Sequence, residues 1–298
     1  MRDDFAVIIL GYGRPNKTKT LRNLAMSGYT GRWYILVGTD DPMLAEYIDM
    51  YGDDKILVFD KGETRHLFDK MTNDDEIRSS VWAYNVAQVK ARELGIRYLM
   101  VLTDDAVNFA YRAWGRHTPD QKLWYRSFTI KQLDAVFEAM VKLMECGQID
   151  CLSMSQGGDH MGGIENPAAK APVLKRKSMN SFLFDTERDP IEFIGRANED
   201  ATTYVREGTL GRIFLTYSAL QLTQPNTQTT DGGLTDLYVE LGTYNKSFFT
   251  VMASPSSVSI GMITSKHKRI HHKINWKHTV PCILSPDWRN NQKGTIEA

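Results

Sequence analysis

The sequence has few cysteines and no net charge, and both facts exclude certain classes of protein. Its three cysteines, Cys146, Cys151 and Cys282, show no paired metal-binding spacing, and so sparse and odd a set favours a reducing compartment over a disulfide framework. The chain has no net charge, because 36 Lys and Arg residues balance 36 Asp and Glu residues. The surface as a whole is therefore no polyanion binder, and any contact with nucleic acid must be local.

Long apolar runs are also missing. The apolar stretch that precedes Gly11 is too short for the core of a secretory signal, and no run approaches the roughly 20 apolar residues that a membrane span needs. The sequence contains no internal repeat and no low-complexity tract. We therefore expect a cytoplasmic protein without membrane contact, located in the host cytoplasm if the protein is viral.

The first third of the chain alternates between apolar strands and short helices. With 298 residues and 42% hydrophobic content, the chain can bury a substantial core. Continuous apolar runs are typical of strands that are buried on both faces of a parallel sheet. The order of these segments predicts an α/β fold with an open, mostly parallel sheet and crossover helices. The expected strands are Phe5–Leu10, Trp33–Val37 and Lys55–Phe59, and the expected helices are Thr18–Met26 and Met43–Met50.

The rest of the chain is less regular. Two segments rich in Trp, Tyr, Arg, Gly and Pro, Asn108–Ser127 and Gln156–Lys177, are expected to be an insertion loop and a mobile loop. Helical spacing of apolar residues and short apolar runs give the other elements. The expected helices are Asp75–Leu94, Ile130–Met144 and Asn198–Glu207, and the expected strands are Tyr98–Leu102, Asp150–Met154, Ser181–Phe184 and Ile191–Ile194.

Ligands of open α/β sheets bind outside the carboxyl ends of the strands. We therefore expect three loops, Gly11–Arg14, Gly38–Asp41 and Thr103–Asp105, to meet in one crevice. Gly11 and Gly13 permit close approach of a ligand to the backbone, although a simple turn explains them equally well. Asp40 is a candidate for a ribose or base contact, with capping of the next helix as the alternative.

The strongest single signal is the pair Asp104 and Asp105, which follows an apolar strand. Two adjacent carboxylates repel each other and lose solvation there, a cost that is explained if a divalent cation binds them. A solvated turn is the alternative. On the preceding helix, Arg78, Trp82 and Asn85 share one face, which either supplies an arginine to a phosphate or is an exposed polar stripe.

In this order and spacing, the motifs resemble those of the GT-A glycosyltransferases. The motifs are LGYGRP, VGTDDP, the helix with Arg78 and Asn85, YLMVLTDDAVNF and FIGRANEDATTYVREG. The chain is more narrowly similar to the TET-associated glycosyltransferase group, which has phage members that act on hydroxymethylated bases in DNA and is related to the GREB glycosyltransferase-like domain. The resemblance covers roughly Phe5 to Arg289.

The resemblance implies a single GT-A domain over residues 1–298 with a C-terminal extension, in which 5–110 bind the nucleotide sugar and 128–289 the acceptor. It implies a UDP-sugar donor and Mn²⁺ or Mg²⁺. The family motif begins with Asp where this chain has Thr103, so Asp105 becomes the principal metal ligand and Asp104 assists. The nucleotide-sugar-binding candidates are Gly11, Tyr12, Gly13, Arg14, Asp40, Arg78, Asn85 and Asp104.

Two further sets of residues are candidates for the reaction centre. Glu199 and Asp200 follow Gly195-Arg196-Ala197-Asn198, and either carboxylate is a candidate to deprotonate or orient the acceptor hydroxyl, with Asp200 slightly preferred. Acids that favour a helix N-terminus are the alternative. GT-A enzymes often recruit a late histidine as a metal ligand, which makes His271 or His272 a candidate.

A DNA acceptor is expected from the resemblance and from two basic segments, residues 170–177 and 266–277. Such segments neutralise phosphates, and a tryptophan among them stacks on a base; a solvated charged face is the alternative. The DNA-binding candidates are Lys175, Arg176, Lys177, Lys273 and Trp276, and the aromatic candidates to fill the gap left by an extruded base are Trp114, Trp124 and Tyr125.

The sequence thus predicts a metal-dependent glycosyltransferase that moves a hexose or pentose from a UDP-sugar to the hydroxymethyl group of 5-hydroxymethylcytosine in bacteriophage DNA. One alternative keeps the enzyme class and changes the acceptor to a glycan, a lipid carrier or a protein. Another is a nucleotide-sugar-binding module without catalysis, motivated by Thr103. A dehydrogenase is disfavoured, because Pro15 interrupts the helix start that cradles a pyrophosphate.

Overall fold

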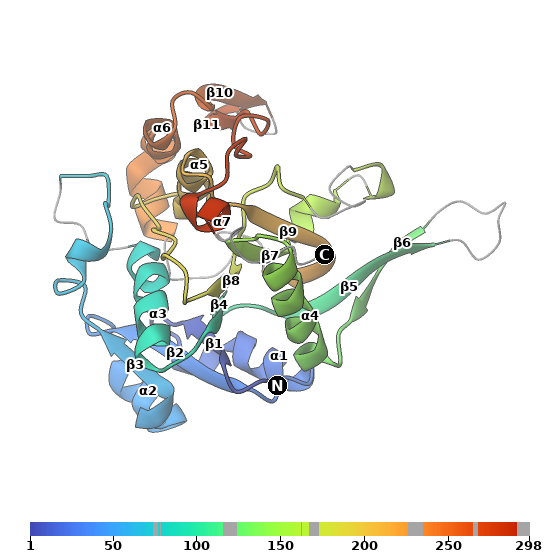
Figure 1. Cartoon of the computed structure of the whole chain (residues 1–298). Coiled ribbons are helices and arrows are strands. Elements are labelled where there is room, and N and C mark those ends of the chain that lie inside the picture. The colour runs from blue at the N-terminus through green and yellow to red at the C-terminus, as the bar shows by residue number, and fades with distance from the viewer. Residues whose placement is uncertain are drawn as a thin grey trace.

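The computed structural model describes residues 1–73, 77, 79–115, 124–161, 163–166, 173–225, 235–264 and 268–290. Its centre is a sheet of nine described strands in the order β3-β2-β1-β4-β8-β7-β9-β5-β6 (Figure 1). The pairings give β8 and β5 one direction and the other seven strands the opposite direction. The predicted α/β class with a mostly parallel sheet is therefore confirmed.

The first four strands form the parallel part of the sheet. Parallel pairing of β1 with β2 and β4, and of β2 with β3, places their carboxyl ends along one edge. The elements are β1 Phe5–Leu10, α1 Lys19–Met26, β2 Arg32–Gly38, α2 Leu44–Tyr51, β3 Ile56–Phe59, α3 Val81–Glu93 and β4 Tyr98–Thr103. The predicted alternation is confirmed, but helix α3 begins at Val81 and not at Asp75, because Ile77, Ser79 and Ser80 are not helical.

The remaining strands extend this sheet, so both proposed halves of the chain share it. Strand β8 lies antiparallel between β4 and β7, and β9 pairs parallel with β7. The elements are α4 Leu133–Cys146, β7 Cys151–Ser155, β8 Ser181–Asp185, α5 Glu199–Thr209 and β9 Phe214–Thr223. Short 3₁₀ helices at Gly157–His160 and Gly163–Glu165 lie in the segment that was expected to be a mobile loop.

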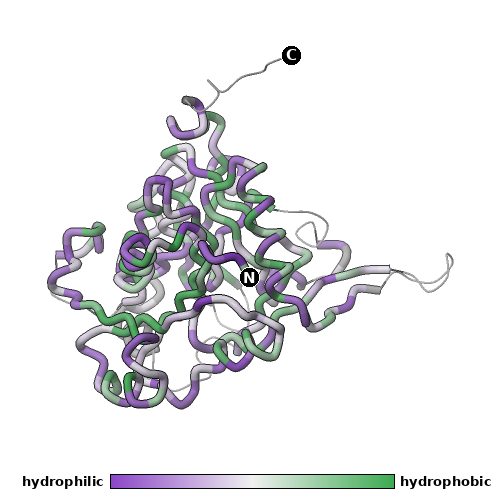
Figure 2. Tube along the Cα trace, turned by 60° about the horizontal axis from the view of Figure 1, so that its bottom comes forward, coloured by the Kyte–Doolittle hydropathy of each residue, from purple (hydrophilic) through white to green (hydrophobic). Residues whose placement is uncertain are grey.

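Alternate residues of β1 supply two separate cores, one on each face of the sheet. Phe5, Val7 and Ile9 pack with side chains of α1, α2 and α4, whereas Ala6 and Ile8 pack with side chains of α3 and α5. This explains why β1 is continuously apolar: both of its faces are covered by helices. Figure 2 shows the hydrophobic segments of the sheet inside the molecule and more hydrophilic segments around it.

Two local predictions were wrong. The expected insertion loop after Asn108 forms strands β5 Asn108–Gly115 and β6 Trp124–Thr129, which join the sheet next to β9. Alternating aromatic and small residues favour such a ribbon. Ile191–Ile194 forms no strand, because side-chain amides of α3 take the place of a neighbouring strand: Gln88 binds the backbone of Ile191 and Asn85 that of Phe193.

A C-terminal unit follows β9 and was expected only as an extension. Helix α6 packs against the β10–β11 hairpin and α5. Its elements are α6 Thr235–Ala253, β10 Val258–Thr264, β11 Lys268–Ile274 and α7 Pro286–Asn290. Helix α6 is broken at Gly242, where a φ of 65° suits a residue without a Cβ. In the described ranges, each helix is too short or too polar to cross a membrane.

Candidate active site at the carboxyl ends of the strands

The turns after β1 and β2 are joined, as predicted. Asp41 is buried and accepts hydrogen bonds from the backbone N–H of Gly13 over 2.8 Å and of Met43 over 2.8 Å. The hydroxyl of Tyr47 accepts one from the N–H of Arg14 over 3.2 Å. Asp41 thus holds the β1 turn to the start of α2, which places the side chain of Arg14 near the end of β4.

Arg14 forms an ion pair with Asp104, in which Nη2 donates to Oδ1 over 2.8 Å. Asp104 is only 4% exposed, and its Oδ2 accepts no hydrogen bond from the described residues. Burial raises the pKa of Asp104 to about 6, although Arg14 lowers it. A buried carboxylate oxygen without a partner is costly, and a cation would remove that cost.

Asp105 is half-buried and is oriented by two side chains. The hydroxyl of Thr103 donates to its Oδ1 over 2.9 Å, and the amide of Gln224 donates to the same atom over 2.6 Å. Gln224 in turn donates to the Thr103 hydroxyl over 2.5 Å and contacts Asn180. Sequence reasoning missed Gln224, because it follows β9, a strand that was not predicted.

A more exposed group lies at the ends of β1 and β2. Asp40 forms an ion pair with Lys61 over 2.7 Å, and the Lys61 ammonium lies 5.7 Å from the centre of the Tyr12 ring. Tyr12 and Asp40 are exposed. Lys61 follows β3 and was not predicted, because nothing in the sequence distinguishes it from the other lysines.

The predicted face of α3 does not point to a ligand. Asn85 is buried, and its amide nitrogen donates to the carbonyls of Val81 and Phe193 over 2.9 and 2.8 Å. Its Oδ1 accepts the N–H of Phe193 over 3.0 Å. Trp82 is buried too, and its indole donates to the carbonyl of Lys61 over 3.1 Å. Asn85 therefore has a structural role, and Arg78 lies outside the described residues.

Glu199 and Asp200 begin helix α5, and their pKa values are shifted in opposite directions. Glu199 is buried, accepts a hydrogen bond from the Ser80 hydroxyl over 2.5 Å and leaves its Oε2 without a hydrogen-bond partner in the described residues. Burial and then the charge of Asp200 raise the pKa of Glu199. Burial opposes ionisation of Asp200 as well, but its ion pair with Lys177 lowers the pKa of this carboxyl.

Tyr84 links these carboxylates to the Asp105 turn. Its hydroxyl has a pKa well above the usual value, first because it is buried and then because Glu199, Asp200 and Asp105 act on it with negative charge. Contacts also connect the two halves: Gln224, which donates to Asp105, contacts Asn180, and Lys177, shortly before Asn180, pairs with Asp200.

His271 and His272 lie on β11, and His272 lies close to Asn198 at the start of α5. Their ring centres are 4.1 Å apart, and Nδ1 of His272 lies 3.3 Å from the amide nitrogen of Asn198. Burial, then His271 and Lys177, lower the pKa of His272 to about 4. The described residues contain no group of three or more His, Cys, Asp or Glu side chains placed to hold a metal. A metal-binding role of either histidine stays a prediction.

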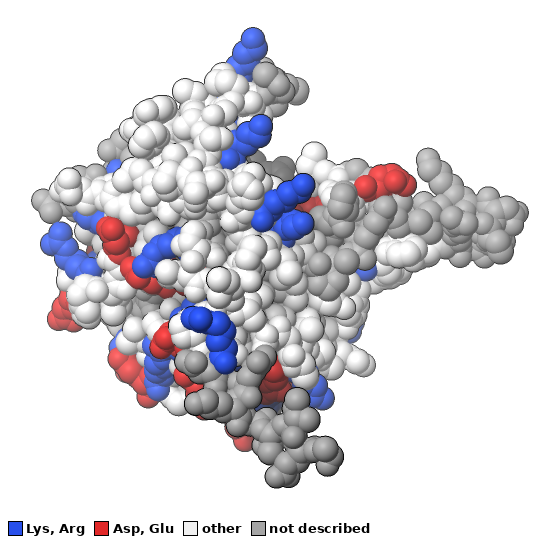
Figure 3. Space-filling view, turned by 45° about the horizontal axis from the view of Figure 1, so that its top comes forward, with Lys and Arg blue, Asp and Glu red and all other residues white. Residues whose placement is uncertain are grey.

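The predicted DNA-binding residues divide into two kinds. Arg176 forms an ion pair with Asp159 and Lys177 one with Asp200, while Trp276 packs against Tyr204 at 5.7 Å between ring centres. These three side chains are therefore engaged within the protein. Lys175 and Lys273 are exposed. Among the described residues on the face seen in Figure 3, Lys and Arg side chains form separate groups.

The fold and this region define an open-sheet α/β protein whose candidate site lies at the carboxyl ends of its parallel strands. The model of the TET-associated glycosyltransferase family matches residues 5–233 of the chain. The chain therefore belongs to the TET-associated glycosyltransferase family, and it is a glycosyltransferase.

Three solved structures are among those similar to this chain. Glucosyl-3-phosphoglycerate synthase from Mycobacterium tuberculosis, in complex with Mg²⁺ and UDP, is 9% identical with a TM-score of 0.45, covering 91% of this chain and 87% of that chain. TarS 1–349 from S. aureus is 13% identical with a TM-score of 0.37, covering 74% and 60%. GalNAc-T7 with UDP, GalNAc and Mn²⁺ is 10% identical with a TM-score of 0.38, covering 74% and 43%. A search of curated proteins gave no match.

Proposed function

We propose that this glycosyltransferase moves a sugar from a UDP-sugar to the hydroxymethyl group of 5-hydroxymethylcytosine in DNA and uses Mn²⁺ or Mg²⁺ at the Asp104–Asp105 turn. The observation that carries the proposal is the acidic turn of a TET-associated glycosyltransferase, in which buried Asp104 keeps one oxygen without a hydrogen-bond partner among the described residues. The UDP donor and the DNA acceptor rest on the resemblance to this family.

The residues of the turn fit a hard divalent cation. Asp105 offers a half-buried carboxylate, and Oδ2 of Asp104 is a second oxygen that lacks a hydrogen bond within the described structure. Mg²⁺ is commonly held by one or two carboxylates together with substrate phosphates and waters, so two aspartates suffice. When bound, the cation would stabilise the negative charge that develops on the UDP leaving group.

The neighbouring side chains have positioning roles in this proposal. Arg14 neutralises Asp104 and limits its freedom, and Thr103 with Gln224 fixes Oδ1 of Asp105. At the ends of β1 and β2, exposed Tyr12 and Asp40 are the candidates to stack on the base and to accept a hydrogen bond from it. The turn at Gly11 and Gly13 lets the nucleotide approach the backbone.

Asp200 is the proposed base. The acceptor hydroxyl loses its proton to Asp200, its oxygen forms the new bond to the anomeric carbon, and UDP leaves with the electron pair of the broken bond. Lys177 favours the ionised form of Asp200, as a base requires. The raised pKa of Glu199 and its hydrogen bond from Ser80 suit an orienting role instead.

The test is product mass on defined duplexes. The full chain is incubated with Mn²⁺, a panel of UDP-sugars and duplexes that differ only in carrying cytosine or 5-hydroxymethylcytosine at one position. We expect a mass increase of one sugar on the hydroxymethylated duplex alone. Donor hydrolysis without any transfer to DNA would disprove the acceptor and leave the glycosyltransferase with a glycan, lipid-carrier or protein acceptor. Absence of donor hydrolysis and transfer together would favour a non-catalytic binding module.

A further inference from the structure

Strands β5 and β6 form a two-stranded ribbon that leaves the body of the protein. Strand β5 pairs with β9 only from Asn108 to Tyr111, whereas its pairing with β6 continues to Gly115. Residues 112–115 therefore have β6 as their sheet neighbour and no second strand in the described structure. Figure 1 shows the ribbon extending away from the sheet at the end opposite to β3.

One face of the ribbon is anchored to the body. Arg112 donates a hydrogen bond to the side chain of Gln221 on β9 and lies over the ring of Tyr125 at 5.5 Å. The Tyr125 hydroxyl lies 2.6 Å from Nδ1 of His160, and Nε2 of His160 lies 2.8 Å from the Ser155 hydroxyl. This chain of contacts fixes the direction of the ribbon, and it removes Tyr125 from the residues that are available to replace a base.

The opposite face presents aromatic residues to solvent. In the β5–β6 register, Tyr111 stands directly opposite Phe128 and Ala113 opposite Arg126. Tyr111 is 41% exposed and Phe128 is 48% exposed. On the anchored face, Trp114 near the outer end of the ribbon is 51% exposed. The solvent face of an antiparallel ribbon is ordinarily polar, so a cross-strand aromatic pair there indicates a binding surface.

The charge of the ribbon favours a polyanion as the partner. Residues 108–115 and 124–129 contain two arginines and no Asp or Glu, although acids and bases are equally frequent in the chain as a whole. Aromatic rings with interspersed cations are the combination that binds nucleic acid, through base contacts and phosphate neutralisation.

We propose that the β5–β6 ribbon docks in the major groove of duplex DNA, with Tyr111, Phe128 and Arg126 as its contact face. This inference rests on the proposed function. The major groove admits a two-stranded β-ribbon, and a substituent on C5 of a pyrimidine projects into this groove. The ribbon thus approaches the duplex from the side that displays the hydroxymethyl group, and Trp114 lies at its outer end.

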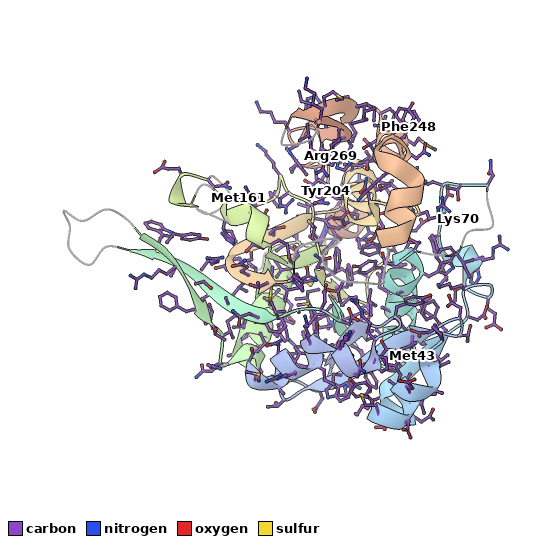
Figure 4. All side chains as sticks on the ribbon, turned by 180° about the vertical axis from the view of Figure 1, so that it is seen from behind. Met43, Lys70, Met161, Tyr204, Phe248 and Arg269 are labelled. Atoms are coloured by element: carbon purple, nitrogen blue, oxygen red, sulfur yellow. The ribbon has the colours of Figure 1, made fainter. Side chains whose placement is uncertain are left out.

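The experiment compares the parent with the double variant Tyr111→Ser/Phe128→Ser and with Arg126→Gln, all as full chains. The matched control is Tyr244→Ser, which removes another exposed tyrosine from α6, the helix that carries Phe248 away from the ribbon (Figure 4). The readouts are the Kd for a hydroxymethylated duplex by fluorescence anisotropy at several salt concentrations, the rate of UDP-sugar hydrolysis without DNA, and the molar mass in solution.

We expect the double variant to raise the Kd for the duplex by about 10-fold or more, because it removes the two rings whose apolar surface the groove would cover. Arg126→Gln should reduce the salt slope by about 0.9, the value for one phosphate contact. UDP-sugar hydrolysis should stay at the parent rate, and Tyr244→Ser should bind as the parent does.

Unchanged Kd and slope in both ribbon variants would overturn the proposal. A parent dimer that becomes monomeric in the double variant, with DNA affinity retained, would overturn it in favour of a second copy on this face. A parent that binds the duplex through the ribbon and transfers no sugar would contradict the proposed function alone.

Discussion

The guanidinium of Arg14 and the buried carboxylate of Asp104 form an ion pair over 2.8 Å between the ends of β1 and β4. The two residues are far apart in the sequence, and parallel pairing of β1 and β4 brings them together. The pair holds the backbone of the acidic turn against the turn after β1. In our account, Arg14 holds Oδ1 of Asp104, and a bound cation would interact with Oδ2.

Arg14→Gln should destabilise the metal-free protein in a pH-dependent way. Without Arg14, an ionised Asp104 stays buried without a counter-charge, at a cost of about 2 kcal/mol, reduced because Arg14 is partly exposed. The folded-state pKa of Asp104, about 6 in the parent, then rises further, so the cost falls as the carboxyl is protonated. Melting temperatures in EDTA should differ more between parent and variant at pH 8 than at about pH 5.5. Arg22→Gln, at an exposed arginine of α1, is the control, and a pH-independent difference would contradict the account.

Asn85→Ala should lower stability without weakening UDP binding. The change leaves the buried N–H and C=O of Phe193 without their partners, which costs about 2–4 kcal/mol. Gln88→Ala should behave alike, because it removes the equivalent clamp on Ile191. Urea unfolding and isothermal titration with UDP separate the two roles. If Asn85→Ala loses UDP affinity while its stability is unchanged, the result would support the nucleotide contact of Asn85 that the sequence predicts.

Lys177→Met should move the acidic limb of the rate profile. Lys177 lowers the pKa of Asp200 against the effect of burial, so its removal raises that pKa and leaves less ionised base at a given pH. The kcat measured with acceptor should therefore fall off at a higher pH than in the parent, while UDP affinity is retained. Asp200→Asn should bind UDP and lose turnover at every pH. Lys175→Met, at the exposed neighbouring lysine, should keep the parent profile; a shift in this control equal to that of Lys177→Met would contradict a specific role of the ion pair.

Glu207 should make the parent less stable as the pH rises through neutrality. Burial raises its pKa to about 7, opposed by Arg206 and Arg212. The folded-state pKa thus lies above the roughly 4.3 expected for an unfolded chain, so the folded state holds the proton more strongly, and this contribution to stability is lost as the pH rises from about 4.3 to about 7. Glu207→Gln cannot titrate. The difference in melting temperature between Glu207→Gln and the parent should therefore increase over this pH range. Each kcal/mol of stability that the parent loses corresponds to about 2–4 °C. A constant difference would show that Glu207 does not titrate there.

The elements that were predicted correctly are those in which local pattern and burial agree. Strand β1 is apolar throughout because helices cover both of its faces, and the alternation of β1–β4 with their helices follows from that pattern. The position of the Asp104–Asp105 turn could be predicted as well, because the end of the apolar strand before it can be recognised in the sequence.

What could not be predicted depends on tertiary partners. Ile191 and Phe193 have the composition of a strand, yet their hydrogen bonds go to two side chains of α3. Nothing in the sequence marks Gln224, and its hydrogen bond to Asp105 depends on the position of β9 in the sheet. Arg176 and Lys177 belong to a basic run in the sequence, and only the fold reveals that each pairs with a buried or half-buried acid. Periodicity does not carry such information.

The most direct test of the central claim is UDP-sugar hydrolysis by Asp105→Asn across a Mn²⁺ titration. Asparagine keeps the shape of the side chain and removes a charged oxygen ligand, so the variant should fold as the parent does. We predict that parent hydrolysis requires Mn²⁺ and stops in EDTA, and that the variant is slower by about two orders of magnitude or more at every Mn²⁺ concentration. Asp54→Asn, at an exposed aspartate before β3, should match the parent. Parent-like hydrolysis by Asp105→Asn in metal-free buffer would contradict the account.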